Sequence, residues 1–465
     1  MLDKFFKIKE SGSNIRTEII AGITTFFTMA YIIFVNPSIL SESGMSWDGV
    51  FVATIIATVV GTLIMALVAN VPYAVAPGMG LNAFFTYTVC FGLGFQWQEA
   101  MAMVFICGII NIIITVTKLR KSIIKAIPRS LQLAIGGAIG LFIAYIGIKN
   151  AGFLEYGATS EGVTTGVDIV PALANFSDPG ALVALAGLVI IVVLMLLKVK
   201  GAMLIGIVGA TIIAIPAGVV SIPPASELFV NKMGAISEVS FSFFGNPGFG
   251  SLFSSPEKIL PAILIIFAFS LSDTFDTVGT FIGTGRKAGI FDQDDETALL
   301  DSSGFKSKMD KALFADSIAT SVGALAGTSN TTTYVESAAG IGVGGKTGFA
   351  SVVTAVLFIL CLPFAALFGI VPGQATAPAL IVVGVLMADS FTGIKWDEIE
   401  EALPAFLTIL IMAFAYSISY GIAAGFIFYC IIKIVKGKAK EVHPILYGAT
   451  ILFILNFVVL ALKII

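Results

Sequence analysis

The sequence has 465 residues, of which 57% are hydrophobic and 12% are charged, and its mean hydropathy is +1.00. This composition is typical of a polytopic membrane protein and excludes a soluble enzyme. The net charge is −3, and no long basic or acidic run indicates a nucleic-acid partner.

The N-terminal residues 1–18 are polar and basic, and they contain no apolar stretch that ends in a small-residue cleavage site. We therefore expect no removed signal peptide. The four cysteines lack the spacing of metal ligands, and we expect them to be small buried side chains. Because the only histidine, His443, lies in a basic loop, we expect no His-based metal site, no catalytic triad and no cofactor.

Apolar runs of roughly bilayer length follow one another along the chain. In order they cover residues 17–40, 49–70, 74–95, 98–117, 128–148, 180–198, 201–220, 259–285, 309–327, 329–344, 348–370, 374–391, 403–420, 421–437 and 445–464. These runs predict an all-α polytopic membrane protein with about fourteen transmembrane spans. The last run is either a further crossing or an interfacial helix.

The basic residues between the runs predict how the chain lies in the membrane. They are Lys4, Lys7, Lys9, Arg16, Lys118, Arg120, Lys121, Lys198, Lys200, Arg286, Lys287, Lys306, Lys308, Lys311, Lys433, Lys436, Lys438 and Lys440. All of them fall on one side, which the positive-inside rule makes cytoplasmic. The segment 221–256 is poor in Lys and Arg, and we expect it to be an external loop. The chain is thus predicted to be a multi-pass protein of the cell membrane with a cytoplasmic N-terminus.

Seven runs precede the external loop, so the eighth run begins outside whereas the first begins inside. This arrangement predicts two inverted seven-span repeats with an extra C-terminal segment. The first repeat covers 1–220, the second covers 257–437, and the last segment, a cytoplasmic loop with an apolar helix, covers 438–465. A faint internal repeat supports the inversion, because residues 127–149 and 371–395 both open with Ile/Val-Pro and close with Gly-Ile-Lys.

The third and tenth runs correspond in the two repeats, and both contain residues that break a helix. The third, 71–89, has two prolines and several glycines before a helical pattern begins near Leu81. The tenth, 327–345, has a Thr-Thr-Thr-Tyr run that favours extended backbone, and helix becomes favourable near Val335. Such paired breaks at membrane depth predict a transporter's binding site. We expect two half-helix N-termini to meet there and to offer N–H groups to a substrate.

Acidic residues lie in or beside these spans. Asp273 and Asp276 lie near the middle of the eighth run and, at three residues apart, share one helical face. A charged side chain at this depth costs at least ~2.5–3.5 kcal/mol, so it normally faces a cavity, a partner or a transport path. Glu336 lies at the start of the tenth-run half-helix, where capping through the helix dipole is an alternative role. We expect Asp316, nearer the cytoplasmic end of the ninth run, to be a structural partner rather than a ligand.

Other side chains at the breaks have two possible roles. Asn82 lies in the first turn of the third-run half-helix, where its amide can bind a ligand or cap the helix. Phe84, Phe85 and Tyr334 could stack on a planar ring, although in a chain with 38 Phe an aromatic residue is more often buried or lipid-facing. The three threonines 331–333 could bond backbone carbonyls instead of a ligand.

Four segments resemble the signature sequences of AzgA-like purine permeases, a branch of the nucleobase–ascorbate (uracil/xanthine permease) superfamily. They are AGITTFFTMAYIIFVNPSIL (21–40), APGMGLNAFF (76–85), FSLSDTFDTVGT (269–280) and GTSNTTTYVESAAGIGVGGKTG (327–348). The resemblance runs from the first span to about the tenth and continues weakly to the C-terminus.

The resemblance implies proton-coupled purine uptake by a homodimer. It also implies that each subunit has a core domain, about 15–117 and 257–370, which moves against a gate domain, about 128–220 and 372–437. By motif match, Asp273 and Glu336 would be the principal purine-binding acids. The full set of candidate substrate-binding residues is Asp273, Glu336, Asn82, Phe84, Thr332, Thr333, Gly80 and Phe275. The candidates for proton coupling are Asp276, Asp273 and Glu336.

The chemistry of a purine fits these residues. A carboxylate accepts from adjacent N–H groups such as guanine's N1–H and 2-amino group, and a buried acid beside another acid can carry a proton at physiological pH. Together with the resemblance, which implies the moving core and the proton coupling, this chemistry leads us to expect an elevator-like proton symporter that favours hypoxanthine and guanine over adenine, with the lipid bilayer as its other partner. The alternatives are a uracil or xanthine carrier of the sister branch, an anion carrier of the same architecture, and a membrane enzyme or channel. Three acids without nearby Arg or Lys disfavour the anion carrier, and no nucleophile–base pair supports an enzyme.

Overall fold

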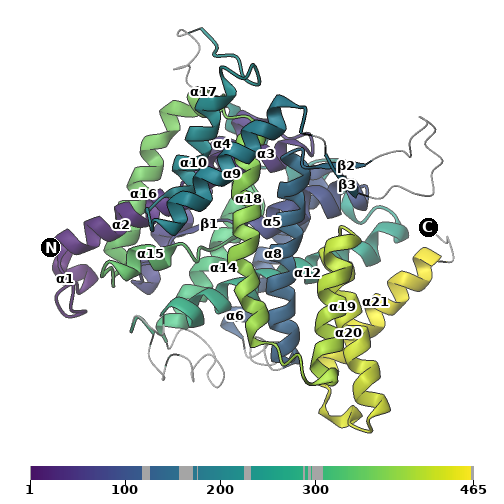
Figure 1. Ribbon diagram of the computed structural model, residues 1–465. Coiled ribbons are helices and arrows are strands. Elements are labelled where there is room, and N and C mark those ends of the chain that lie inside the picture. Colours follow the sequence, from purple (N-terminus) through teal and green to yellow (C-terminus); the bar gives the residue numbers. More distant parts are fainter. Residues whose placement is uncertain are drawn as a thin grey trace.

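The structure is a computed structural model that describes residues 2–117, 126–156, 171–174, 176–224, 232–285, 289–291, 295 and 307–461. Of the basic residues used to predict the orientation, Lys118, Arg120, Lys121, Arg286, Lys287 and Lys306 lie outside the described residues. The described chain is mostly helical (Figure 1).

The helices coincide with the predicted apolar runs. The first half comprises α1 (Leu2–Phe6), α2 (Ile15–Met29), α3 (Ile32–Ser41), α4 (Trp47–Ile64), η1 (Met65–Ala69), β1 (Val75–Pro77), α5 (Met79–Ala83), η2 (Phe84–Gly92), α6 (Trp97–Val116), α8 (Arg129–Asn150), β2 (Leu154–Tyr156), β3 (Pro171–Leu173), α9 (Pro179–Leu196) and α10 (Ala202–Ala214). The second half comprises η3 (Met233–Glu238), η4 (Ser242–Phe244), α11 (Phe249–Leu252), α12 (Pro256–Thr280), η5 (Phe281–Gly285), α14 (Lys308–Ala326), β4 (Thr331–Thr333), α15 (Ser337–Gly342), α16 (Gly348–Cys361), η6 (Leu362–Phe364), α17 (Ala365–Phe368), α18 (Gly373–Met387), η7 (Ala388–Gly393), α19 (Ile399–Phe414), α20 (Ile418–Val435), η8 (Ala439–Glu441) and α21 (Pro444–Ala461).

Within the described residues, nine stretches of helix are long and apolar enough to cross a membrane, and Ala202–Ala214 and Pro444–Val458 are shorter apolar helices. The third and tenth runs are interrupted, each by a short strand followed by a short helix. The predicted class, an all-α polytopic membrane protein with broken third and tenth spans, is therefore confirmed.

Polar side chains and a proline mark where the central helices begin. Ser46 caps α4 and Ser307 caps α14, each by accepting from a backbone N–H three residues on. Asp310 accepts from the Ser307 N–H in return and completes a capping box. Pro256 takes the first position of α12, where its missing N–H leaves no helical bond unmade.

The two broken segments meet as a short antiparallel pair of strands. Val75 lies opposite Thr333, Ala76 opposite Thr332 and Pro77 opposite Thr331. Two further backbone bonds extend the pair, from Gly78 N–H to the Asn330 carbonyl at 2.9 Å and from Tyr334 N–H to the Ala74 carbonyl at 3.0 Å. Proline and β-branched threonine favour extended backbone here, and the pairing satisfies polar groups that lipid could not. Because the strands are antiparallel, α5 and α15 leave the crossing in opposite directions.

The helices pack in two groups, with α8 and α18 side by side near the centre (Figure 1). One group, α2, α4, α6, α12, α14, α15 and α16, surrounds the paired strands, and in the other α8, α9, α10, α18, α19 and α20 pack along one another. Glycines allow the close approach of α8 and α18, since a Cβ on Gly147 would lie 2.9 Å from the Ile381 nitrogen. The extra C-terminal helix α21 lies along α20 and reaches α12.

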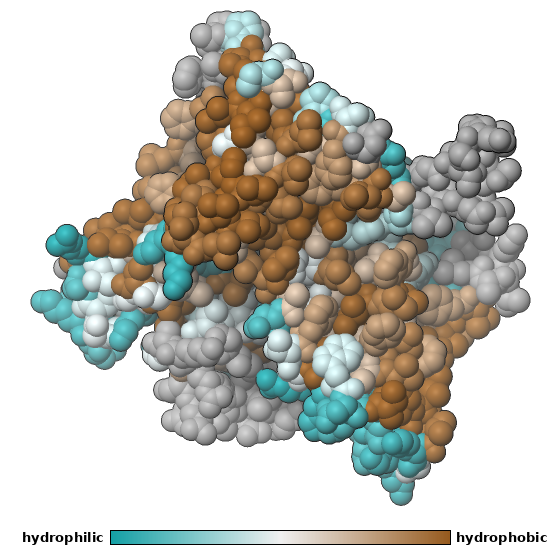
Figure 2. Space-filling model, viewed as in Figure 1, coloured by the Kyte–Doolittle hydropathy of each residue, from teal (hydrophilic) through white to brown (hydrophobic). Residues whose placement is uncertain are grey.

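Apolar side chains cover much of the outer face of α9, α10 and α16 (Figure 2). Leu182, Val189, Val193 and Ile212 are among the exposed residues of α9 and α10. Polar residues gather instead at α1 and at the turn after α20 (Figure 2). An apolar face with polar ends is the surface that a bilayer covers.

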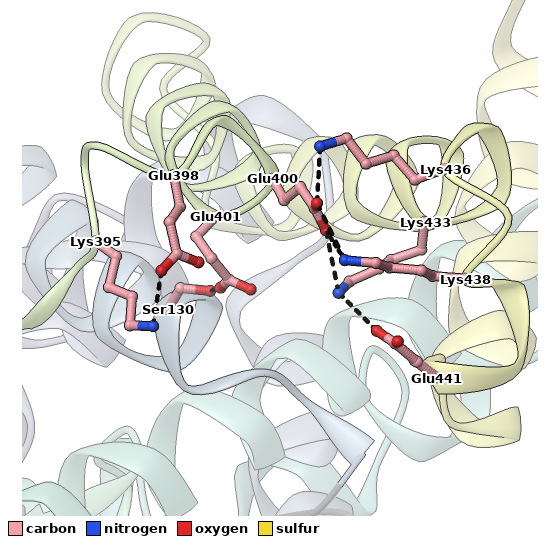
Figure 3. A network of polar contacts seen from close by, with 9 residues as sticks. All are labelled: Ser130, Lys395, Glu398, Glu400, Glu401, Lys433, Lys436, Lys438 and Glu441. Carbon is pink, nitrogen blue, oxygen red and sulfur yellow. Dashed lines mark hydrogen bonds and ion pairs between the residues drawn. The ribbon is translucent and has the colours of Figure 1, made fainter.

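An ion-pair network joins the start of α19 to the end of α20 (Figure 3). The Glu400 carboxylate lies 3.4 Å from Lys433 Nζ, 2.8 Å from Lys436 Nζ and 3.2 Å from Lys438 Nζ. Glu441 of η8 is a second partner of Lys433, at 3.0 Å. These pairs hold the turn between α20 and α21 against α19.

The structure also contains order that the sequence did not predict. The short hairpin β2–β3 pairs Leu154 with Leu173. In the described part of the predicted external loop, η3, η4 and α11 form compact turns. Val239 in this part is buried and lies against Gly49 of α4 and against Gly327, which ends α14.

Candidate functional site

Three threonines and two aspartates form one hydrogen-bonded network between α12, α14 and β4. Thr277 Oγ1 donates to Asp316 Oδ2 at 2.9 Å, and Thr333 Oγ1 donates to Asp316 Oδ1 at 2.8 Å. Thr332 Oγ1 donates to Asp276 Oδ2 at 3.3 Å and lies 3.0 Å from Thr277 Oγ1. The network thus connects an acid of the eighth span to the strand at the tenth-span break.

Within this network, Asp316 holds protein elements together. Its side chain is buried, and both carboxylate oxygens accept from threonine hydroxyls of the neighbouring elements. Thr332 and Thr333, predicted to bind substrate, are buried as well, and their hydroxyls bond Asp276 and Asp316. The geometry matches the structural role expected for Asp316.

Asp273 lies nearly one turn earlier on α12 and faces different neighbours. Its Oδ2 accepts from Asn111 Nδ2 of α6 at 2.9 Å and from Thr320 Oγ1 of α14 at 3.2 Å. Ser270 Oγ donates to Asn111 Oδ1 and so orients the amide. The Asp273 side chain is 0% exposed, and its Oδ1 has no hydrogen-bond partner among the described residues. Asp273 is therefore enclosed between three helices.

By contrast, the face of α12 that carries Asp276 is open. Asp276 and Gly279 are exposed, and a Cβ on Gly279 would meet no atom within 4 Å. Phe275 beside them is half-buried. One helix therefore presents an enclosed carboxylate at Asp273 and an accessible one at Asp276.

Glu336 is half-buried at the start of α15 and is held by the first membrane segment. Its Oε1 accepts from the Tyr31 hydroxyl, and its backbone carbonyl accepts from Thr28 Oγ1 at 3.3 Å. Glu336 takes the N-cap position of α15, and its side chain makes no capping hydrogen bond to that helix. Nearby, the Tyr334 hydroxyl donates to the Pro77 carbonyl at 2.6 Å and ties the two broken segments together.

Asn82 also links the broken segments. Its side chain is completely buried, and its Oδ1 accepts from Ser329 Oγ. Gly78 rather than Asn82 takes the N-cap position of α5. A Cβ on Gly80 would collide with Ile139, so Gly80 lies at the contact between α5 and α8. In this structure, both predicted residues are engaged in contacts within the protein.

Two of the aromatic candidates, Phe84 and Phe275, differ in exposure. Phe84 is fully buried and lies edge-on to Phe269, with 4.7 Å between the ring centroids. Because Phe275 is half-buried, it is the candidate ring that is open to a planar ligand without rearrangement.

The predicted residues thus form three sets. The first set contains Asp276, Thr332 and Thr333. Glu336 belongs with it, because Glu336 lies near enough to Asp276 for their charges to interact. Asp273 and Asn82 each belong to a separate buried set. Within the described chain, none of the hydrogen-bond donors to the four acids is a lysine or arginine.

Sequence reasoning missed several residues that orient these side chains. They are Tyr31, Asn111, Thr277 and Ser329. Three of them lie inside the four segments that carry the family resemblance. The fourth, Asn111, is a polar side chain within an apolar run, which was a detectable signal.

Comparison with known proteins agrees with this architecture. A model of a permease family matches residues 16–424. The guanine/hypoxanthine permease PbuO of Bacillus subtilis is 42% identical over 466 residues, which cover 98% of this chain and 100% of that protein. The adenine permease AdeP of Escherichia coli is 38% identical over 464 residues, which cover 98% of this chain and 96% of that protein. The transmembrane domain of a cyanobacterium bicarbonate transporter, BicA, has the same fold, with a TM-score of 0.61 at 18% identity over 89% of this chain and 97% of that one.

Proposed function

The chain belongs to this permease family, and we propose on that basis that it is a secondary active transporter that imports purine nucleobases together with protons. The predicted membership of the nucleobase–ascorbate superfamily is confirmed. Relatives named for guanine/hypoxanthine and for adenine support purines as the substrate class. We favour the 6-oxopurines over adenine, because their N1–H donates to a carboxylate whereas the N1 of adenine is an acceptor.

The observation that carries this proposal is the pair of accessible carboxylates, Asp276 and Glu336, beside the crossing of the broken spans. Asp276 accepts from Thr332 and Glu336 accepts from Tyr31, and neither is paired with a cation in the described chain. A carboxylate has about four acceptor positions, so both acids retain acceptors for a ligand. A nearly neutral base with several N–H donors fits them, whereas an anion would be repelled.

The resemblance implies a purine-binding role for Asp273, but its enclosure leads us to propose that it holds the coupled proton instead. Its carboxyl group is enclosed without a cation, and an isolated buried negative charge is costly. The Asp273 Oδ1, which has no hydrogen-bond partner among the described residues, is the atom available for the proton. Because Asp273 and Asp276 lie only three residues apart on α12, charge on one disfavours charge on the other. Proton binding at Asp273 and substrate binding beside Asp276 are therefore linked.

We propose further that the helix group around the paired strands moves past the other group. Near the side that we expect to be external, hydrogen bonds link η2, which packs on α5 and α6, to α8 and to the turn between α19 and α20. Asn150 Nδ2 of α8 donates to Tyr87 Oη of η2 at 3.2 Å, and Thr88 Oγ1 donates to the Tyr416 carbonyl at 3.2 Å. Lys149 Nζ lies 5.4 Å from the centre of the Tyr87 ring. A closed external contact with an open face at Asp276 is what an inward-facing state of such a carrier requires.

The remaining parts of the proposal concern the membrane. The basic residues between the spans support a cytoplasmic N-terminus in the cell membrane. The exposed apolar face of α9 and α10 is available to lipid or to a second copy, and we propose a homodimer on the family resemblance.

Uptake of labelled hypoxanthine by cells that express the protein tests the proposal. We expect uptake to rise with an inward proton gradient, to collapse with a protonophore, and to be inhibited more by guanine than by adenine. Glu336→Gln and Asp273→Asn should each lower uptake about tenfold or more, because each removes a charge-assisted hydrogen bond or a proton site. The exposed acid Glu398, which pairs with Lys395, supplies the control Glu398→Gln, which should keep uptake. If both site variants kept the wild-type affinity for hypoxanthine and the wild-type proton dependence of uptake, the assignment of Glu336 and Asp273 to the site would be refuted.

The shared fold with a bicarbonate transporter makes an anion carrier the second candidate. The absence of lysine and arginine among the donors to the four acids in the described chain weighs against it. Bicarbonate, uracil and xanthine belong in the same competition panel as the purines. Strong inhibition by bicarbonate alone would favour the anion carrier, and inhibition by uracil or xanthine would favour the sister branch.

A further inference from the structure

The first membrane segment turns at a point close to the candidate site. A turn at Ala30 and Tyr31 separates α2 from α3. The backbone N–H groups of Ile33 and Phe34 donate to the carbonyls of Ala30 and Tyr31, three residues back, each at 3.1 Å. Such three-residue bonds tighten the backbone relative to an α-helix and redirect the side chains at the turn.

The helix before this turn supports the half-helix that follows Glu336. Gly340 of α15 lies directly on α2, since a Cβ there would be 2.6 Å from the Ala21 carbonyl oxygen and would collide with the Thr25 hydroxyl. One turn further along α2, Thr28 Oγ1 donates to the Glu336 carbonyl at 3.3 Å. The backbone position of Glu336 is therefore set by α2.

The turn itself sets the side chain of Glu336. Tyr31 is 1% exposed, and its hydroxyl donates to Glu336 Oε1. The ring of Tyr31 packs 6.5 Å from that of Tyr334, centre to centre, so the phenol has little freedom. A phenol has only two rotatable side-chain bonds, and a buried one therefore holds its hydrogen-bond partner in a defined orientation at small entropic cost.

We propose that Tyr31 is a positioning residue for purine binding, which fixes the Glu336 carboxylate so that Oε2 and the remaining acceptor positions face the substrate. The inference rests on the proposed function, because it assigns to Tyr31 a role at that same site. Tyr31 contacts Glu336 and acts through it. The first membrane segment thus becomes a third element of the site, beside the eighth span and the two broken spans.

The variant Tyr31→Phe removes only the hydroxyl and keeps the packed ring. A hydrogen bond to a charged group is worth on the order of tenfold or more in an equilibrium constant. We expect KM for hypoxanthine uptake to rise about tenfold, while the maximal rate per transporter at saturating substrate stays within about twofold. Tyr73→Phe is the matched control, because Tyr73 is equally buried and, among the described residues, its hydroxyl bonds Thr284 at 2.7 Å.

A double-mutant cycle shows whether Tyr31 acts through Glu336. Hypoxanthine binding to the purified full-length protein is titrated calorimetrically for the wild type, Tyr31→Phe, Glu336→Gln and the double variant. Where Glu336→Gln binds too weakly to titrate, Glu336→Asp takes its place. We expect Tyr31→Phe to weaken binding about tenfold in the wild type and by less than about twofold when Glu336 is altered.

Two outcomes overturn the inference. In the first, Tyr31→Phe binds hypoxanthine as tightly as the wild type does. In the second, the losses of binding free energy from Tyr31→Phe and from the Glu336 variant are additive. A wild-type protein that binds none of hypoxanthine, guanine and adenine contradicts the proposed function instead. The two failures are therefore distinct, since the second appears before any variant is compared.

Discussion

The glycines of α15 provide a matched pair of substitutions that tests whether the position of this short helix controls the site. A Cβ on Gly340 would lie 2.6 Å from the Ala21 carbonyl oxygen, whereas ordinary contacts begin at 3.4 Å. On Gly342, in the same helix, a Cβ would meet nothing within 4 Å. Gly340→Ala and Gly342→Ala therefore add the same atom to the same helix, and only the first adds it against α2.

The magnitude follows from the overlap. To restore contact distance at Gly340, α15 and α2 must separate by about 0.8 Å, because the Ala21 carbonyl is backbone and cannot rotate away. Overpacking of this kind costs roughly 1–3 kcal/mol, and the better helix propensity of alanine offsets about 0.5–1 kcal/mol of it. A binding residue must stay within about 0.5 Å of its productive position, so the shift moves Glu336 out of range. We expect KM for hypoxanthine to rise about tenfold.

The assay is hypoxanthine uptake at several concentrations, with thermal unfolding of each purified variant in detergent. Gly340→Ala should raise KM and lower the melting temperature. Gly342→Ala should leave KM unchanged and should keep or slightly raise the melting temperature, as Gly→Ala does in an uncrowded helix. Equal KM values for the two variants would refute the idea that contact with α2 sets the position of Glu336.

Two further predictions concern residues outside the accessible carboxylates. Asp316→Asn disturbs the hydrogen bonds from the Thr277 and Thr333 hydroxyls, so it should destabilise the purified protein by about 1–3 kcal/mol. It should change purine affinity less than Glu336→Gln does. Loss of purine binding at an unchanged melting temperature would contradict this prediction. Hydrogen bonds from Lys436 and Lys438 lower the pKa of Glu400 from 4.5 to about 2, so its stabilising effect is complete above pH 4.5 and disappears as the pH falls towards about 2. The melting temperature of the wild type should therefore fall more steeply over that range than that of Glu400→Gln, and parallel curves would show that the network in Figure 3 adds no stability.

The sequence was informative where a local rule decides the structure. Two prolines with neighbouring glycines, and a run of three β-branched threonines, disfavour a regular helix, so the breaks before Leu81 and Val335 were predictable and are present. The expectation that Asp316 is a structural partner rested on its place in the ninth run and agrees with its two threonine donors. The roles in purine and proton binding remain predictions.

Contacts between distant segments were beyond local rules. Asp273 and Asp276 differ by roughly 60° around a helix, and helical spacing cannot tell which of them faces neighbouring helices. Their separation into an enclosed and an open carboxylate depends on Asn111 and Thr320, which lie on other helices. The bond from Tyr31 to Glu336 joins residues 305 positions apart, and only the packing of α15 on α2 reveals it.

The way in which the acids are bonded bears on how such a carrier could move. Asp273 and Asp316 are enclosed by amides and hydroxyls, and Asp276 and Glu336 each take one hydroxyl. Hydroxyls and amides can bond either form of a carboxyl group, whereas a lysine or arginine would hold it ionised. A helix group that carries several uncompensated negative charges through an apolar environment would incur a large electrostatic cost. Protonation removes part of that charge and a neutral purine adds none, so in the proposed mechanism the purine-loaded group moves more easily when the proton is bound. In the proposed mechanism, the dependence of purine transport on the proton would then follow from the chemistry of the enclosed acids, without direct contact between the proton and the purine.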